Sequence, residues 1–494
     1  MNKLKHIILK QWANTILSKW EKDCQKPQKI YDANFKFIQK HSKQKQIKAL
    51  NNFKNIRKLP LKDYNDYKEI FNNSLEDKIN PLNGEQIHFW ATSTGSTDVP
   101  KIFPISPIVD KSSKMFQKTR ASLMIKHLNI WTSKPELIFV LPGEKQEFNP
   151  NLPIGQIGYY FQKQAPKWLK KQFIFSKALY KNKAIFDKWH IVAALLSDCS
   201  GITTSIPARL TYFINYIKAN QKELKTSIEN ETFPKEYFNK LSKKRIKYIV
   251  NVLDNPINSI KDIWPSLNFV CAWHAGDSCN KQLKELKRCI DFKNVKFIDQ
   301  IYNSSEDIFN IPLIEEVGGP LNIYNHIVEF YDSKTNTFFW PWEIKENEIY
   351  EIVITNTMGL TRYRMYDNII CTGFYKNTPK IAFHSRNIPE ISLGWCTISE
   401  KQLSMAINNL NQGINSPYYF SVNKKGNGLT IISYKNDIEL QLENLNKNLK
   451  IQNPNYKKQL VLGNVIPIKF VKITENEFYQ LMLNNANSKR LLLK

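Results

Sequence analysis

The stretch RYRMYDNIICTGFYKNTPKIAFHSR, residues 362–386, follows EIYEIVITNTMGLT and continues its pattern. Aromatic and β-branched residues alternate with polar ones in both segments, which predicts antiparallel strands. Arg362 and Arg364 flank Tyr363, so both arginines are expected on one face of a strand. Asp367 is expected to follow a strand, where its carboxylate is suited to accept hydrogen bonds from ribose hydroxyls.

A hydroxyl-rich loop lies earlier in the chain, in HFWATSTGSTDVPKIFPIS, residues 88–106. Its polar and small residues are Ser93, Thr94, Gly95, Ser96 and Thr97, and Lys101 follows them. The hydroxyls donate hydrogen bonds, glycine allows a close approach of the backbone, and lysine adds a point charge suited to phosphate. These features favour a polyphosphate-binding loop that is not a Walker motif. The alternative is a plain flexible linker.

A third polar motif is YNSSE, residues 302–306, placed after a predicted strand. Mg²⁺ is commonly held by one carboxylate together with waters and phosphates, so Glu306 is a candidate metal ligand. Ser305 and Tyr302 accompany it as candidate nucleotide-binding residues. Each of the three motifs is weak alone, and the argument depends on their order and spacing.

The pattern around these motifs predicts an α/β fold with two domains. Residues 1–80 are predicted to be helical, and their first helix carries an apolar residue at every fourth position: Leu4, Ile8, Trp12, Ile16 and Trp20. We expect this helix to pack on the main domain, and the alternative is a contact with a membrane surface. Helices and strands then alternate, a strand-rich part follows, and the pattern changes at about Arg386. The expected domains are a large one, 1–385, and a small mobile α+β one, 386–494.

The composition of the chain limits the classes of partner that it is expected to bind. The formal net charge of the 494 residues is +27, but only nine of the 71 basic residues are arginine, and the lysines are spread along the whole chain. Nucleic acid is therefore not expected as the main partner. No apolar run is long enough to span a membrane, and the start does not resemble a signal peptide. Seven scattered cysteines fit reduced thiols and a cytoplasmic location. The spacing of Cys271, His274, Cys279 and Cys289 matches no standard zinc pattern.

Together the motifs resemble one family. Residues 93–101 resemble the S-x-G-S/T-T-G-x-P-K loop of adenylate-forming enzymes. Within that superfamily, residues 362–386 resemble the R-Y-R-x-G-D segment of the auxin-responsive Gretchen Hagen family of acyl-acid amido synthetases, and YNSSE resembles its Y-x-S-S-E motif. The resemblance extends over about residues 45–485.

This resemblance implies a ligase that uses ATP and Mg²⁺. A small carboxylic acid would be converted to an acyl-adenylate and then transferred to an amine such as an amino acid. There are two alternatives. The acyl group could be transferred to a thiol, or the chain could be a degenerate homologue that only binds a ligand or a protein. The roles carried over are phosphate contacts by Ser93, Gly95, Ser96, Thr97 and Lys101, nucleotide and Mg²⁺ contacts by Tyr302, Ser305 and Glu306, a ribose contact by Asp367, and a hinge at Arg386. The identity of the acid and amine and the oligomeric state are left open.

Three residues depart from the family pattern. Asp98 and Tyr366 replace glycines of the motifs, and Asp307 stands where relatives often have glycine. A carboxylate beside a triphosphate costs Coulomb energy, and a side chain at a glycine position opposes backbone conformations with positive φ. These substitutions therefore raise the question whether the nucleotide site is functional.

Overall fold

The computed structural model divides the chain into two compact units, Met1–Ala91 with Phe103–Ser385, and Thr92–Ile102 with Arg386–Lys494. The structure describes residues 3–76, 78–92, 101–128, 136–138, 146–149, 152–157, 183–204, 207–233, 242–274, 277–386, 390–393, 395–410, 418–423, 425–474 and 477. A large N-terminal and a smaller C-terminal part, each with helices and strands, confirm the predicted fold class. The expected domain boundaries and the mobility of the small domain stay predictions.

The strands predicted from the opening stretch form a six-stranded sheet in the larger unit, with the order β11-β10-β12-β13-β14-β9. Its strands are β9 (Gly319–Pro320), β10 (His326–Asp332), β11 (Thr337–Phe339), β12 (Ile349–Asn356), β13 (Tyr363–Tyr375) and β14 (Thr378–Arg386). β10 pairs with β12 and β12 with β13, both antiparallel, which confirms the prediction for the segments that form β12 and β13. Asp367 lies inside β13 and not after a strand, because the register shifts between Glu351 and Val353 and the strand continues past the irregularity.

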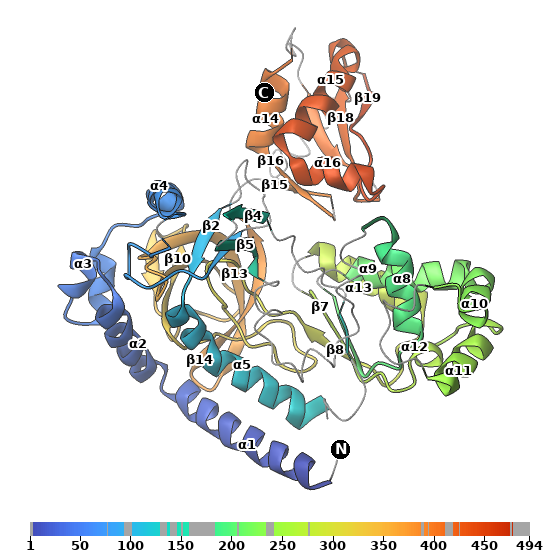
Figure 1. Cartoon of the computed structure of the whole chain (residues 1–494). Coiled ribbons are helices and arrows are strands. Elements are labelled where there is room, and N and C mark those ends of the chain that lie inside the picture. Colours follow the sequence, from blue (N-terminus) through green and yellow to red (C-terminus); the bar gives the residue numbers. More distant parts are fainter. Residues whose placement is uncertain are drawn as a thin grey trace. The chain divides into compact units, whose positions relative to one another are not determined.

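A second sheet of the larger unit is parallel and follows the order β3-β6-β7-β8. Its strands are β3 (Glu136–Ile138), β6 (Gly201–Thr203), β7 (Phe269–Ala272) and β8 (Lys296–Asp299). The accompanying helices are α8 (Lys183–Leu195), α9 (Pro207–Ala219), α10 (Gln221–Glu229), α11 (Lys243–Leu253), α12 (Ile260–Ile263) and α13 (Asp277–Cys289) (Figure 1). Their apolar faces form one core with the sheet, which explains the near-continuous apolar runs of these strands.

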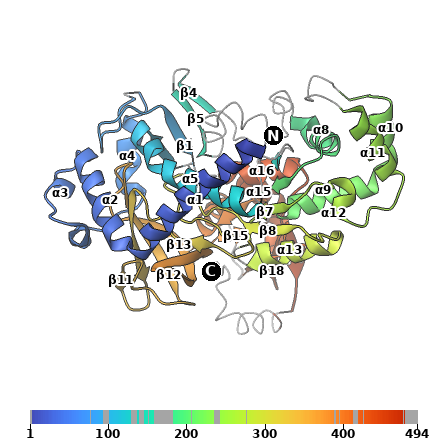
Figure 2. The same cartoon turned by 90° about the horizontal axis from the view of Figure 1, so that it is seen from below.

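A third sheet, with the order β2-β1-β5-β4, brackets the hydroxyl-rich loop between its first two strands. Its strands are β1 (Phe89–Thr92), β2 (Ile102–Ile105), β4 (Gln146–Asn149) and β5 (Leu152–Gln156). The helices of the first 130 residues are α1 (Lys3–Gln25), α2 (Pro27–His41), α3 (Lys45–Lys48), the 3₁₀ helix η1 (Phe53–Lys58), α4 (Asn65–Asn73) and α5 (Pro107–Leu128). α1 packs along α5 (Figures 1 and 2).

The buried face of α1 differs from the predicted one. Its core residues are Ala13, Leu17, Trp20 and Cys24, whereas Ile8 and Trp12 are 55% and 38% exposed. An α-helix has 3.6 residues per turn, so a strict four-residue repeat drifts about 40° per step and leaves the core within three steps. The helix does pack on the main domain, since the Trp20 ring stacks on Tyr375 at 4.8 Å. A membrane contact through the exposed residues stays a prediction.

The smaller unit has the α+β composition expected after residue 386. It contains β15 (Glu390–Ser392), β16 (Thr397–Ser399), α14 (Glu400–Asn408), β17 (Tyr419–Val422), β18 (Leu429–Ser433), α15 (Asp437–Gln452), α16 (Pro454–Val461) and β19 (Lys469–Lys472). Ser399 and Gln402 form a capping box that starts α14, and Asn453 caps α16 ahead of a proline. Leu403, Ile431 and Leu445 lie in its separate core. Within the described part of the chain, no helix has the length and hydropathy needed to cross a membrane.

Candidate active site

The YNSSE motif forms a closed loop after β8. The Ser304 hydroxyl oxygen accepts hydrogen bonds from the backbone N–H groups of Glu306 and Asp307, at 3.1 and 3.4 Å. The loop is closed at its base by the Phe309 N–H, which donates to the Tyr302 carbonyl at 2.8 Å. A serine at this place offers its backbone an alternative to strand pairing, so the hydroxyl-rich sequence itself favours the turn.

This loop meets the opening stretch through two tyrosine hydroxyls. Tyr302 donates to Asp367 Oδ2 at 2.8 Å, across 65 residues of sequence. Tyr363 donates to Glu306 Oε1 at 3.3 Å. All four side chains are buried. Burial, followed by the negative charge of Glu306, raises the pKa of Tyr363, so its hydroxyl keeps its proton and donates. Two separate buried hydrogen bonds therefore fasten the loop to the opening stretch.

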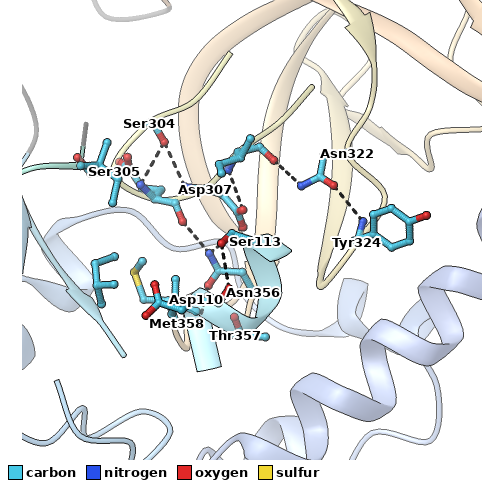
Figure 3. Close-up of a pocket in the computed structure, with 15 residues that line it drawn as sticks. Asp110, Ser113, Ser304, Ser305, Asp307, Asn322, Tyr324, Asn356, Thr357 and Met358 are labelled. Carbon is cyan, nitrogen blue, oxygen red and sulfur yellow. Dashed lines mark hydrogen bonds between the residues drawn. The ribbon is translucent and has the colours of Figure 1, made fainter. Parts of the chain in front are cut away.

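A hollow opens beside the loop, with about 540 Å³ of space that includes a part open to solvent. Ser304, Ser305, Glu306 and Asp307 line one side of it, and Asp110 and Ser113 of α5 line another (Figure 3). Asn356, at the end of β12, reaches the loop from below and donates to the Glu306 carbonyl at 2.9 Å (Figure 3). Polar residues thus line one part of the hollow, and apolar residues line another: Ile105, Val109, Ile157, Ile308 and Met358.

Sequence reasoning did not assign a role to Tyr363 or Asn356. Tyr363 lies between the two arginines of the opening stretch, and Asn356 is a polar residue that ends the apolar run of β12. The sequence feature that could have pointed to Asn356 is a polar side chain at the end of a buried strand. Neither residue is identifiable as a partner of residue 306 from spacing, because the contacts cross 50 and 57 residues.

The two arginines support the sheet around the site. Arg362 forms an ion pair with Glu329 of β10, at 3.0 Å, and Arg364 forms one with Glu351 of β12, at 2.8 Å. Their guanidinium groups lie over the stacked rings of Phe338 and Tyr331, respectively. Both side chains thus reach one pair of stacked rings, but the prediction that they share a face of a strand fails for Arg362, which precedes β13 and has a φ of +43°.

Tyr366 occupies the glycine position of the motif in a glycine-like conformation. Its φ is +57°, in the left-handed region, so the side chain does not prevent the positive φ. The ring lies 4.7 Å from the Arg364 guanidinium, and the hydroxyl donates to Asp63 Oδ2 at 3.3 Å. These contacts offset the backbone cost and direct the ring to Asp63.

We expect Tyr366→Gly to be more stable than Tyr366→Ala by about 1 kcal/mol. Both variants lose the ring contacts, but only alanine keeps a Cβ in the left-handed region, which costs about 1–2 kcal/mol, partly offset by the entropy of glycine. Urea unfolding of the two variants measures the difference. Equal stability would mean that the backbone at this position relaxes without strain.

Several candidate residues lie outside the described part of the structure. They are Ser93, Gly95, Ser96 and Thr97, together with the departure Asp98. Lys101 is partly buried directly before β2. Arg386 is the last residue of β14, and its side chain is not described. Their roles stay predictions.

Two of the residues weighed as zinc ligands, Cys271 and His274, make hydrogen bonds to Asp299. The Cys271 thiol donates to the Asp299 carbonyl at 3.5 Å, and the His274 backbone N–H donates to Asp299 Oδ1 at 2.9 Å. Among the residues that the structure describes, no three His, Cys, Asp or Glu side chains form a group that would hold a metal ion. Burial, with a smaller effect of Lys287, lowers the pKa of His274 to about 4.

His274 is therefore expected to make stability depend on pH. The unfolded chain binds a proton on this histidine below about pH 6.5, while the folded chain does so only near pH 4. Stability is thus fully present above pH 6.5 and is lost as pH falls toward 4, by about 2 kcal/mol at pH 5. Urea unfolding at pH 7 and pH 5 should show a smaller loss for His274→Gln than for the unchanged chain. An identical loss in both would exclude this histidine as the cause.

Comparison with known proteins identifies the family. The sequence profile of the GH3 family N-terminal domain matches residues 31–289, which is more than half of the chain, and the profile of the GH3 family central domain matches residues 320–386. The chain belongs to the GH3 family. This membership confirms the resemblance found in the sequence motifs.

Curated GH3 relatives match over parts of their length. Indole-3-acetic acid-amido synthetase GH3.4 of Arabidopsis thaliana is 23% identical over 232 residues, 41% of this chain and 38% of the relative. Jasmonoyl–L-amino acid synthetase JAR4 of Nicotiana attenuata is 40% identical over 65 residues, 13% of this chain and 11% of the relative. The matched segments thus cover well under half of these relatives.

The solved structure of AtGH3.15 acyl acid amido synthetase in complex with 2,4-DB superimposes over nearly the whole chain. The match covers 96% of this GH3 chain and 92% of that one, with a TM-score of 0.64 and 17% sequence identity. At this identity the likeness establishes the fold, which is therefore the GH3 fold in both units.

Proposed function

We propose that this GH3 chain is an ATP-dependent acyl-acid amido synthetase. The observation that carries the proposal is the buried hydrogen bond from Tyr302 to Asp367, because it joins the Y-x-S-S-E-like loop to the R-Y-R-x-G-D-like strand. Family membership supports the same reaction, since the relatives are named as synthetases that join indole-3-acetic acid or a jasmonoyl group to an amine or amino acid.

In the proposed reaction, a carboxylate displaces pyrophosphate from the α-phosphate of ATP, and an amine then displaces AMP from the acyl carbon. Asp367, oriented by Tyr302, would hold the ribose hydroxyls. The hydroxyls of Ser93, Ser96 and Thr97, the backbone at Gly95 and the ammonium of Lys101 would contact the phosphates. Arg386 would lie at the hinge to the small domain. Such catalysis depends on positioning and on stabilising developing negative charge.

Mg²⁺ fits the oxygen-rich side of the hollow. Glu306, Ser304 and Ser305 are among the residues that line it, and hard cations prefer oxygen ligands such as carboxylates and hydroxyls. Glu306 would hold the ion, with Ser305 beside the nucleotide, and the bound ion would neutralise phosphate charge. A cytoplasmic location, inferred from cysteine usage, remains part of the proposal.

Pyrophosphate release from ATP with a panel of carboxylic acids tests the proposal. We expect release with acid and ATP alone, and an amide product when an amine is added. A requirement for a thiol such as coenzyme A would replace amide synthesis by thioester synthesis. No release with any acid, together with no binding of ATP–Mg in calorimetry, would favour a homologue that only binds a ligand or a protein.

A further inference from the structure

Asp307, the carboxylate next to Glu306, faces a buried histidine. His326 is the first residue of β10 and has no exposed surface. Its Nδ1 lies 3.1 Å from Asp307 Oδ2, and its Nε2 lies against the carbonyl oxygen of Asn322. Nε2 therefore meets an acceptor, and Nδ1 lies within ion-pair distance of a carboxylate, although its geometry is not that of a hydrogen bond. Two neighbouring oxygen atoms favour the protonated imidazolium, which carries a donor on each nitrogen.

The charge of His326 follows from these contacts. Burial lowers the pKa of His326, but the Asp307 carboxylate and the Asn322 carbonyl outweigh it, and the pKa is raised. When His326 is protonated, the Asp307–His326 pair is electrically neutral. The other titratable groups lining the same hollow are Glu306, Asp110 and Tyr324. Tyr324 donates its hydroxyl to Asp23 of α1, and Asp110 lies 3.2 Å from His88.

The remaining contacts of Asp307 turn its carboxylate toward the protein. Oδ1 accepts the Ile308 N–H at 2.8 Å, and Oδ2 also accepts the Asn356 amide at 3.1 Å. The same Asn356 amide group donates to the Glu306 carbonyl at 2.9 Å. One asparagine thus connects the two acidic residues, and the histidine anchors the second of them to β10.

Without its cation, Asp307 would act against the proposed function. Like charges repel one another, and a bound triphosphate carries several negative charges. Asp307 adds a carboxylate beside Glu306, and the buried His326 ring lies 3.1 Å from it.

We propose that His326 is a positioning residue of the nucleotide site: it neutralises Asp307 and, with Asn356, holds the loop so that Glu306 faces the hollow. This inference rests on the proposed function. It extends the set of residues that support the site to a strand without any motif, and it explains how the chain keeps an additional carboxylate beside the nucleotide.

The test separates charge from packing by a double-mutant cycle. His326→Phe removes the cation at similar size, and His326→Gln keeps a neutral donor for Asp307. We expect each to raise KM for ATP–Mg about tenfold while kcat changes less than threefold. Adding Asp307→Asn to either variant removes the unbalanced charge and should return KM to within about threefold of the unchanged chain. His41→Phe, which disrupts a partly exposed histidine–carboxylate pair outside this hollow, is the control and should leave KM unchanged.

The measurements distinguish a failure of this inference from a failure of the proposed function. Circular dichroism and thermal melts identify variants that fail to fold, and His326→Gln then serves in place of His326→Phe. A KM that stays high after Asp307→Asn, or single variants that lower kcat alone, would overturn the inference. If the unchanged chain binds ATP–Mg but releases no pyrophosphate, the proposed function fails, and the same cycle is read from the dissociation constants of ATP–Mg in calorimetry. Absence of ATP–Mg binding by the unchanged chain overturns both.

Discussion

Glu306→Gln should lower the rate of ATP-dependent pyrophosphate release about 100-fold and leave the fold intact. Glutamine keeps the size of the side chain and can still accept the hydrogen bond from Tyr363, which is 3.3 Å long in the structure. It loses the negative charge that a hard cation requires. Loss of one preorganised electrostatic group in an active site typically costs about 100- to 1,000-fold in rate. Steady-state assays at several Mg²⁺ concentrations measure the effect.

Glu315→Gln is the matched control for this prediction. Glu315 also carries a glutamate charge, but its side chain is 61% exposed and its ion pair with Lys296 is 3.8 Å long. Exposed pairs of this kind contribute about 0–1 kcal/mol, so we expect an unchanged rate. Normal pyrophosphate release by Glu306→Gln, at every Mg²⁺ concentration, would remove Glu306 from the proposed metal site.

Glu329→Ala should reduce the free energy of unfolding by about 3–5 kcal/mol. The variant leaves the guanidinium of Arg362, only 6% exposed, without its partner at 3.0 Å. Removing one member of a buried ion pair costs this amount, because the other charge stays buried. Arg57, 3.5 Å from the same carboxylate, also loses its partner. Urea unfolding followed by circular dichroism measures the loss.

Glu351→Ala provides the comparison on the neighbouring strand. Its carboxylate is equally buried, but its partner Arg364 is 29% exposed and can be solvated after the substitution. We therefore expect a loss of about 1–2 kcal/mol, in the range of ordinary point substitutions. If both variants lost the same free energy, the exposure of the arginine would not be the deciding factor, and the account of the buried pair would be wrong.

The strands and the family could be predicted because the patterns that indicate them are local in the sequence. Alternation with a period of two depends only on neighbouring residues, and β12 and β13 appear where that pattern places them. The order of short motifs along the chain is likewise a property of the sequence, and the GH3 profiles match the same region. The buried face of α1 was predicted less well, because a four-residue repeat departs from the helical period.

Pairings across long stretches of sequence were decided only by the tertiary structure. Tyr302 meets Asp367, and His326 meets Asp307, because two strands and a loop come together in a register that no local pattern encodes. The positive φ of Tyr366 depends in the same way on contacts with Arg364 and Asp63, which offset a conformation that tyrosine alone disfavours. The sequence by itself thus determined the element types, the motifs and the family. Which carboxylate is neutralised, and which tyrosine holds which acid, were set by burial, since charges and hydrogen-bonding groups removed from water must find their partners within the fold.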